Sequence, residues 1–145
     1  MILLADTNMF IKYWRVLTRS RKDDTAAKEL ETYKQIMSVN EIITCGVVRA
    51  ELLHGATSET NYQQMAEALN KMPSMDLDKS DWNELGHQLF RYRTGGFTVP
   101  FTDAVIASIG IKYGIPVWTD DKHFSMMQSV IPQLKVIRTE ELIRR

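Results

Sequence analysis

The sequence is poor in cysteine, in long hydrophobic runs and in excess charge of either sign. Its single cysteine, Cys45, cannot form an internal disulfide, which is consistent with a reducing compartment such as the cytoplasm. No stretch approaches the roughly 20 apolar residues of a transmembrane helix, so we expect no part of the chain to span a membrane. The 18 basic and 18 acidic side chains cancel, which excludes nucleic-acid binding by bulk charge but leaves open a local basic surface.

The composition is typical of one globular domain, which we expect to cover residues 1–145. Of these residues, 44% are hydrophobic and 25% are charged. A chain of this length can bury a hydrophobic core without the help of disulfides or a structural metal. We find no internal repeat, linker or low-complexity segment that would divide it.

Short apolar runs alternate with segments of helical periodicity. We expect strands at residues 2–5, 41–45, 75–78, 115–119 and 134–137, and helices at residues 9–17, 25–39, 47–54, 61–72, 80–93 and 103–113. Thr7 or Asn8 is expected to cap the first of these helices, Thr102 the last, and Gly114 to end it. The alternation predicts an α/β fold, a three-layer sandwich whose central, mainly parallel sheet has about four or five strands flanked by helices.

Four carboxylates stand at positions where a parallel sheet places its chemistry. Asp6 follows the first strand and Glu51 lies in the helix after the second, while Asp103 opens the apolar helix 103–113. Asp121 follows the strand at 115–119. Right-handed crossovers place strand-to-helix turns at one edge of such a sheet, and ligands bind there. Each acid alone could cap a helix or lie in solvent, but their joint placement favours a common site.

Carboxylates that lie close together repel one another and partly protonate unless a counter-charge joins them. No histidine or cysteine accompanies all four acids, so the ligands would be carboxylate oxygens. Such ligands favour magnesium or manganese over zinc. Such an ion promotes phosphodiester hydrolysis. We therefore expect the four carboxylates to surround a Mg²⁺ or Mn²⁺ ion.

Other polar residues near these acids are weaker candidates. Residues that could orient the carboxylates by hydrogen bonding are Thr7, Asn8, Thr102, Thr119 and Asp120, although capping and turn formation explain them equally well. Because Asp120 adjoins Asp121, the sequence leaves open which of the two faces the metal. His123 fits an exposed or internally satisfied histidine better than a substrate contact.

Four segments resemble, in order and spacing, the signature segments of PIN (PilT N-terminus) domains. They are Leu4-Ala5-Asp6-Thr7-Asn8, Ala50-Glu51-Leu52-Leu53-His54-Gly55, Phe101-Thr102-Asp103-Ala104-Val105-Ile106-Ala107 and Trp118-Thr119-Asp120-Asp121-Lys122-His123-Phe124. Within this family the chain looks most like the VapC toxins of bacterial and archaeal toxin–antitoxin pairs. It departs from the family pattern at Cys45-Gly46, where many members have a Ser or Thr that opens the short helix.

The resemblance implies a magnesium- or manganese-dependent endoribonuclease whose acidic quartet is Asp6, Glu51, Asp103 and Asp121. With the charge argument above, it implies that Asp6, Asp103 and Asp121 hold one or two metal ions and that Glu51 binds or positions the attacking water. It also implies a homodimer and a cognate VapB-like antitoxin whose C-terminal segment occupies the acidic groove. Basic side chains would then grip the backbone of an RNA substrate in a salt-dependent manner. The candidates for this contact are Arg15, Arg91 and Arg93, each of which could instead lie on a solvated helix face.

Three other classes of protein remain as alternatives. A phosphoacceptor receiver domain needs an acidic pair near the first strand and a lysine late in the sheet, whereas this chain has Asp6 alone and Lys122 directly beside Asp121. A haloacid-dehalogenase-type phosphatase needs a second aspartate where Asn8 stands. An inactive PIN-like module would keep the fold, with its acids serving only a protein partner.

Overall fold

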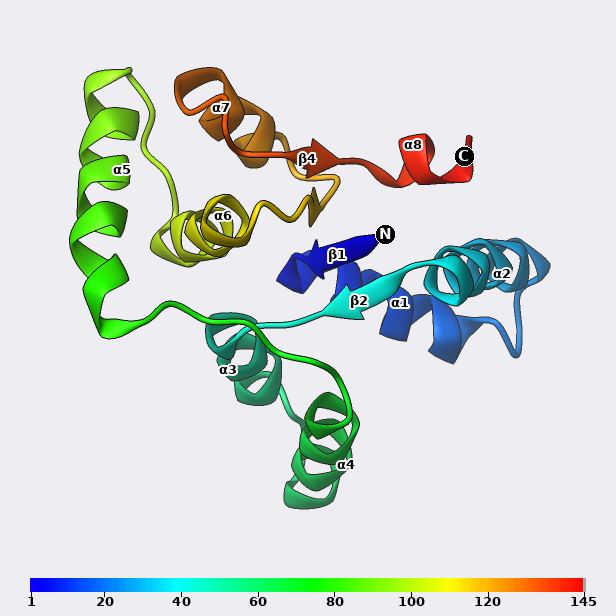
Figure 1. The fold of residues 1–145 in the computed structure, drawn as a ribbon. Coiled ribbons are helices and arrows are strands. Elements are labelled where there is room, and N and C mark those ends of the chain that lie inside the picture. Colours follow the sequence, from blue (N-terminus) through cyan, green and yellow to red (C-terminus); the bar gives the residue numbers. More distant parts are fainter. Residues whose placement is uncertain (145) are drawn as a thin grey trace.

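In the computed structural model, which describes residues 1–144, a parallel sheet lies between two layers of helices (Figure 1). Its strands are β1 (Ile2–Ala5), β2 (Glu41–Ile43), β3 (Val117–Trp118) and β4 (Val136–Ile137). Within the described residues these four strands are all parallel and follow the order β2-β1-β3-β4. The predicted three-layer α/β fold is confirmed.

The helices divide between the two faces of the sheet (Figure 1). One face carries α1 (Thr7–Arg19), α2 (Asp24–Val39) and α8 (Thr139–Ile143), and the other carries α3 (Gly46–His54), α4 (Glu59–Asn70), the short 3-10 helix η1 (Lys79–Asp81), α5 (Trp82–Thr94), α6 (Phe101–Tyr113) and α7 (Lys122–Val130). Among residues 1–144, no helix is both long and apolar enough to cross a membrane.

The continuous apolar run of β1 is explained by burial on both of its faces. Leu3 and Ala5 belong to the hydrophobic core formed with α1, α2 and α8, whereas Leu4 belongs to the core on the opposite face. Val117 and Trp118 of β3 divide between the two cores in the same way. Successive side chains of a strand point to opposite faces, so a central strand between two helix layers needs apolar residues throughout.

Helix α6 packs closely against the sheet and carries Asp103 in its first turn. Its residues 104–110 are all buried. A Cβ atom at Gly110 would lie 3.0 Å from Val117 Cγ2 and 3.1 Å from Ile115 O, so glycine permits this close approach to β3. Gly114 ends the helix in the left-handed conformation with φ of 65°, as predicted.

The strand expected at residues 75–78 does not form. Ser74 makes one parallel bridge with Thr44, and the aspartates that follow serve helix N-termini instead. Asp76 Oδ1 accepts a hydrogen bond from Gly46 N (2.7 Å) at the start of α3, and Asp78 is the N-cap of η1. These capping contacts hold the segment as an irregular connection between the helices.

The expected N-caps are also corrected, because both helices begin earlier than predicted. Asp6, not Thr7 or Asn8, is the N-cap of α1, since the helix starts directly after β1. Pro100, not Thr102, precedes α6, because the proline ring disfavours helical backbone in the residue before it and thus marks the boundary.

Helices α7 and α8 are additions to the predicted set. Helix α8 has five residues, too few for a periodic pattern, and α7 contains several residues of modest helix propensity. Asp121 caps α7, and its Oδ1 atom accepts a hydrogen bond from His123 N (2.9 Å).

Candidate functional site

Three aspartates lie at helix N-termini. Asp6 and Asp121 follow the carboxyl ends of β1 and β3, which are neighbours in the sheet, and they are the N-caps of α1 and α7. Asp103 lies in the first turn of α6. The partial positive charge of a helix N-terminus favours a carboxylate. Three segments that are distant in the sequence therefore each contribute an acid to the same region.

The hydroxyl group of Thr119 links two of these aspartates. Thr119 Oγ1 donates a hydrogen bond to Asp6 Oδ2 (2.9 Å) and accepts one from Asp121 N (3.0 Å). Thr119 and Asp6 are 1% and 2% exposed, so their hydrogen bond lies inside the protein. Burial raises the pKa of Asp6, and the hydrogen bond from Thr119 opposes that rise.

Among the four acids, Asp103 has the most clearly raised pKa. Burial, followed by the charges of Asp6 and Asp121, raises the pKa of Asp103 from 3.8 to about 6. Its side chain is only 15% exposed, so little water is left to stabilise the ionised form. At neutral pH the site therefore holds a carboxylate that would be stabilised by a nearby positive charge.

Glu51 completes the group of acids from helix α3. Its Oε1 atom accepts a hydrogen bond from Thr7 Oγ1 (2.8 Å), which ties α3 to the start of α1. The negative charge of Glu51 raises the pKa of both Asp6 and Asp103, as expected for carboxylates within reach of one another. The structure thus places the four acids that the sequence predicts in one region, although among the described residues Asp6 and Glu51 are not within 4.8 Å of both Asp103 and Asp121. We call them the acidic cluster.

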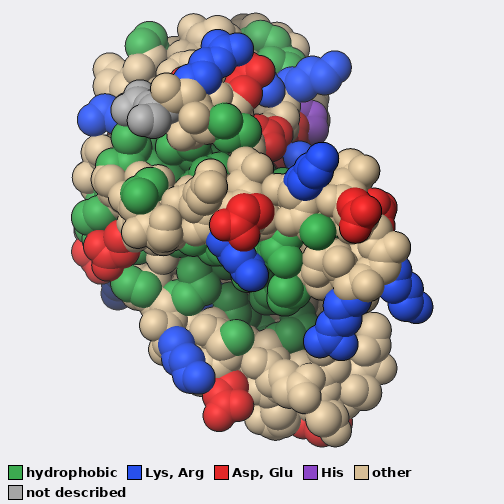
Figure 2. Space-filling model, turned by 90° about the vertical axis from the view of Figure 1, so that its right-hand side faces the viewer, with side chains coloured by type: hydrophobic (Ala, Val, Ile, Leu, Met, Phe, Trp, Pro, Cys, Tyr) green, Lys and Arg blue, Asp and Glu red, His purple; other side chains and the backbone are tan. Residues whose placement is uncertain are grey.

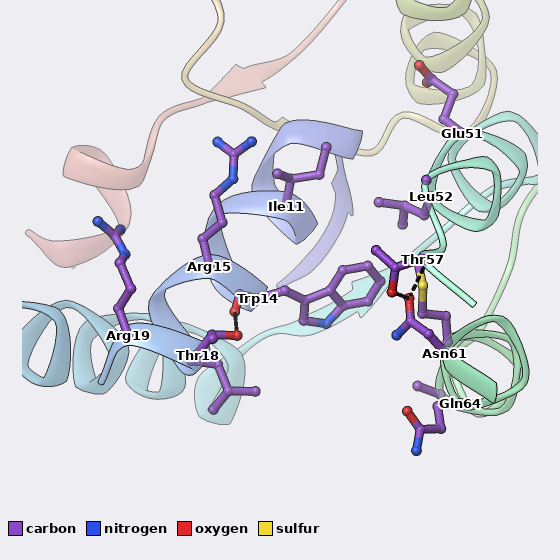
Figure 3. A pocket seen from close by; sticks show the side chains of 14 residues that line it. Ile11, Trp14, Arg15, Thr18, Arg19, Glu51, Leu52, Thr57, Asn61 and Gln64 are labelled. Carbon is purple, nitrogen blue, oxygen red and sulfur yellow. Dashed lines mark hydrogen bonds between the residues drawn. The ribbon is translucent and has the colours of Figure 1, made fainter. Parts of the chain in front are cut away.

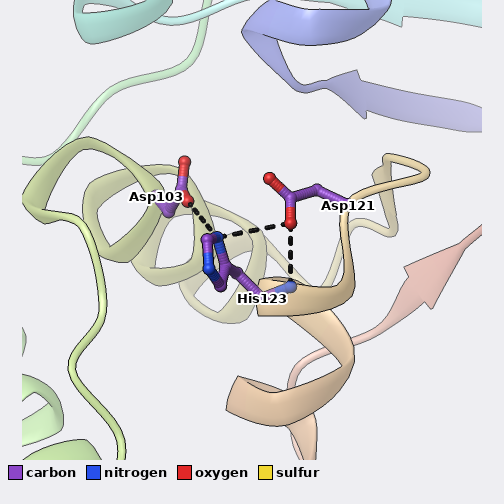
Figure 4. Close-up of side chains that lie close together, drawn as sticks. All are labelled: Asp103, Asp121 and His123. Carbon is purple, nitrogen blue, oxygen red and sulfur yellow. Dashed lines mark hydrogen bonds and ion pairs between the residues drawn. The ribbon is translucent and has the colours of Figure 1, made fainter.

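His123 joins the acidic cluster (Figure 4). Its Nδ1 atom lies 3.3 Å from Asp121 Oδ1 and 3.5 Å from Asp103 Oδ2. One ligand atom from each of these three residues lies within 4.8 Å of the others, as a shared metal ion requires. From the sequence alone, His123 is not expected in the site. Its position two residues after Asp121, in the first turn of a helix, is the signal that would have found it.

Asp120 faces away from the acidic cluster. Its carboxylate accepts hydrogen bonds from Thr139 N (2.9 Å) and Thr139 Oγ1 (2.8 Å), and Lys12 Nζ lies 3.5 Å from it. Asp120 thereby fastens the start of α8, and Asp121 is the one of the pair that points toward Asp103. Across residues 1–144, the side chains of Asn8 and Thr102 make no hydrogen bond to the acidic cluster.

The three arginines expected to contact RNA have different surroundings. Arg15 and Glu51 line a common cavity of about 1180 Å³ between α1, α3 and α4 (Figure 3). Arg91 Nη2 instead donates a hydrogen bond to Val130 O (3.1 Å), which holds α5 to α7. The Arg93 guanidinium lies 5.8 Å from the centre of the Phe90 ring. Of the three, Arg15 is the one that shares a cavity with a member of the acidic cluster.

The fold and the acidic cluster define a class of α/β protein with a candidate metal site beyond the ends of its parallel strands. The family model of the PIN domain matches residues 3–129. The chain belongs to the PIN domain family. Comparison with curated proteins gives no match.

Solved structures with a similar fold include VapBC proteins. VapBC from Salmonella typhimurium, bound to DNA, has a TM-score of 0.71 and 18% identity, with 96% of this chain and 98% of that chain covered. VapBC-1 from nontypeable Haemophilus influenzae has a TM-score of 0.70 and 19% identity, with 97% of this chain and 99% of that chain covered. VapBC2 from Rickettsia felis, bound to a promoter DNA fragment, has a TM-score of 0.66 and 20% identity, with 95% of this chain and 98% of that chain covered. At these identities the likeness establishes the fold.

Proposed function

We propose that this PIN-domain protein is a divalent-metal-dependent endoribonuclease and the toxin of a VapBC-type toxin–antitoxin pair. PIN domains are in general nucleases. The observation that carries the proposal is the meeting of Asp6, Glu51, Asp103 and Asp121 in one partly buried cluster. Residues 1–145 would form a single nuclease domain, of which the family match covers 3–129.

The donor set fits a small divalent cation such as Mg²⁺ or Mn²⁺. Carboxylate oxygens are the ligands these ions prefer, and the raised pKa of Asp103 reflects a negative field that a cation would relieve. In the proposed enzyme, Asp6, Asp103 and Asp121 hold the ion. When bound, it acts as a Lewis acid toward a phosphodiester and stabilises the charge that develops on the phosphoryl oxygen.

The surrounding residues hold these carboxylates ready for that role. The Thr119 hydroxyl donates a hydrogen bond to Asp6 Oδ2 and accepts one from the backbone N–H of Asp121, so it fixes both residues. Thr7 fixes Glu51, which we assign to orient the attacking water and to accept its proton. Groups held in place before substrate arrives need not reorganise during the reaction, which lowers its barrier.

An RNA strand would approach along the cavity that Arg15 and Glu51 share. Arg15 is placed to contact the phosphate backbone, whereas Arg91 is already engaged with α7. Unpaired RNA is the proposed substrate, because a flexible single strand can enter a narrow groove more easily than a duplex can.

The proposed partners are a VapB-like antitoxin and a second copy of the chain. The similar structures are VapBC complexes, which supports an antitoxin partner. Hydrophobic side chains gather in a hollow on the face shown in Figure 2, with lysine and arginine side chains around it. Separately from that face, Trp82 and Phe90 on α5 and Phe101 on α6 are half exposed or more; α5 lies on the side of the molecule turned away in Figure 2. These side chains also support coverage by another protein surface. The cytoplasm, where RNA and antitoxin meet, is the proposed location.

The alternative of a receiver-like regulatory module has no specific support. A receiver needs a lysine within its acidic pocket, and Lys122 is exposed at the start of α7.

The proposal is tested by RNA cleavage. The wild-type protein is expected to cut single-stranded RNA with Mg²⁺ or Mn²⁺ and to be inactive in EDTA. Asp6→Asn keeps the shape of the side chain but removes its charge, so it should lower the cleavage rate at least about a hundredfold. The matched control is Asp120→Asn, whose carboxylate faces α8 and whose loss should leave cleavage within about threefold. Equal cleavage by wild type and Asp6→Asn, or none by wild type with any divalent ion, would contradict the proposal.

A further inference from the structure

The Nδ1 edge of His123 is turned toward the acidic cluster. Nδ1 itself is buried, and among the described residues it has no hydrogen-bond partner. The side chain as a whole is 45% exposed, so the rest of the ring reaches solvent while Nδ1 faces Asp103 and Asp121 (Figure 4). A buried nitrogen without a partner carries a desolvation cost unless something else binds it.

We propose that His123 is a nitrogen ligand of the divalent ion held by Asp103 and Asp121, and that it makes the site prefer Mn²⁺ to Mg²⁺. This inference rests on the proposed function, since it concerns the same ion. It changes the donor set from carboxylate oxygens alone to a mixture of oxygen and nitrogen.

The separations between the three side chains match those of ligands that share one ion. Two ligands about 2.0–2.2 Å from an ion, at angles of about 90° to 110°, lie about 2.8–3.6 Å from each other. Nδ1 lies 3.3 Å from Asp121 Oδ1 and 3.5 Å from Asp103 Oδ2. Neither contact has the geometry of a hydrogen bond from a protonated ring. An ion placed among these atoms would satisfy the nitrogen and both carboxylates together.

The backbone fixes the position of the imidazole. Asp121 caps α7, and its Oδ1 atom accepts a hydrogen bond from the backbone N of His123 (2.9 Å). Thr119 holds Asp121 from the other side through the Asp121 N–H. The capped helix start thus presents an aspartate and a histidine side by side, and little side-chain entropy remains to be lost when both bind an ion.

The chemistry of the nitrogen donor predicts the selectivity. Mg²⁺ demands near-ideal octahedral geometry and is held through a few oxygen ligands while it keeps several waters. Mn²⁺ also binds carboxylate oxygen, but as a first-row transition-metal ion it accepts an imidazole nitrogen more readily than Mg²⁺ does. Replacing a coordinated water by imidazole should therefore strengthen the binding of Mn²⁺ more than that of Mg²⁺.

Pulsed electron paramagnetic resonance of the Mn²⁺-loaded full-length protein tests the ligand directly. The experiment compares protein containing ordinary histidine with protein in which histidine alone is ¹⁵N-labelled. We expect a nitrogen coupling that changes with the label and that is lost in His123→Ala. The matched control is His87→Ala, because His87 is exposed on α5, where it stacks on Phe90, and its loss should leave the coupling intact.

Calorimetric titration of the same proteins tests the selectivity. His123→Ala should lower the affinity for Mn²⁺ about tenfold or more and change the affinity for Mg²⁺ by less than about threefold. Circular dichroism establishes that the variant is folded. If wild type binds Mn²⁺ without any histidine coupling, or if His123→Ala keeps the Mn²⁺ preference, the inference is wrong while the proposed function stands. If wild type binds neither ion, both are wrong.

Discussion

Replacing Asp103 by asparagine should stabilise the metal-free protein. Burial and the charges of Asp6 and Asp121 raise the pKa of Asp103 from 3.8 to about 6, so the folded state holds its proton more tightly than the unfolded state does. The ionised carboxylate therefore opposes folding. This effect is absent below about pH 4, grows between about pH 4 and 6, and is complete above that range.

The size of the effect follows from the shift. A rise from 3.8 to about 6 corresponds to about 3 kcal/mol of unfolding free energy, which is an upper bound because the side chain keeps some contact with water. We expect Asp103→Asn to gain about 1–3 kcal/mol at pH 8, or about 4–10 °C in melting temperature for a chain of this length. At pH 5 the gain should fall to about half, because the folded wild type is then mostly protonated at Asp103.

Thermal unfolding followed by circular dichroism in EDTA measures this gain. Asp120→Asn is the control, since its carboxylate accepts hydrogen bonds from Thr139 and its loss should give no gain at either pH. Adding Mn²⁺ should raise the melting temperature of wild type and leave that of Asp103→Asn nearly unchanged. An Asp103→Asn protein no more stable than wild type at pH 8 in EDTA would refute the claim that the buried, ionised carboxylate of Asp103 opposes folding.

Further predictions concern the same site and its RNA groove. Thr119→Val removes the hydroxyl that holds Asp6 and Asp121, so calorimetry should show an affinity for Mn²⁺ about 10- to 100-fold lower. The cleavage rate should fall as the pH drops below about 6, because protons then compete with the ion for Asp103, and a flat profile between pH 7 and 5 would contradict this. Arg15→Gln should weaken RNA binding and reduce the slope of log affinity against log salt by about 1, measured by fluorescence anisotropy, and an unchanged slope would remove Arg15 from the interface.

The placement of the acids could be predicted because it depends on topology. A carboxylate that directly follows a strand, as Asp6 does, lies at the edge where a parallel sheet binds ligands, whatever the detailed packing. Asp103 could be placed because an acid opening an otherwise apolar helix is carried with that helix into the core.

The choice between Asp120 and Asp121 depended on an element that the sequence does not reveal. Asp120 is held by Thr139 at the start of α8, a helix too short to leave a periodic pattern. Without knowledge of that helix, the sequence does not show which of the two neighbouring aspartates faces the metal site.

Contacts that local sequence patterns do not show also explain why neither the position of His123 nor the irregular structure of residues 75–78 was predicted. His123 belongs to the site only because α7 begins at Lys122 with Asp121 as its cap, and that helix start was not predicted. At residues 75–78 the alternating pattern suggested a strand, but Asp76 bonds to Gly46 and Asp78 caps η1. Long-range capping of this kind depends on tertiary structure, which local periodicity does not record.

Anomalous X-ray diffraction from crystals soaked in Mn²⁺ tests the central claim most directly. We predict a strong manganese peak within ligand distance of the carboxylates of Asp6, Asp103 and Asp121. Crystals soaked at millimolar Mn²⁺ that show no peak there, or peaks only among surface acids elsewhere, would contradict it.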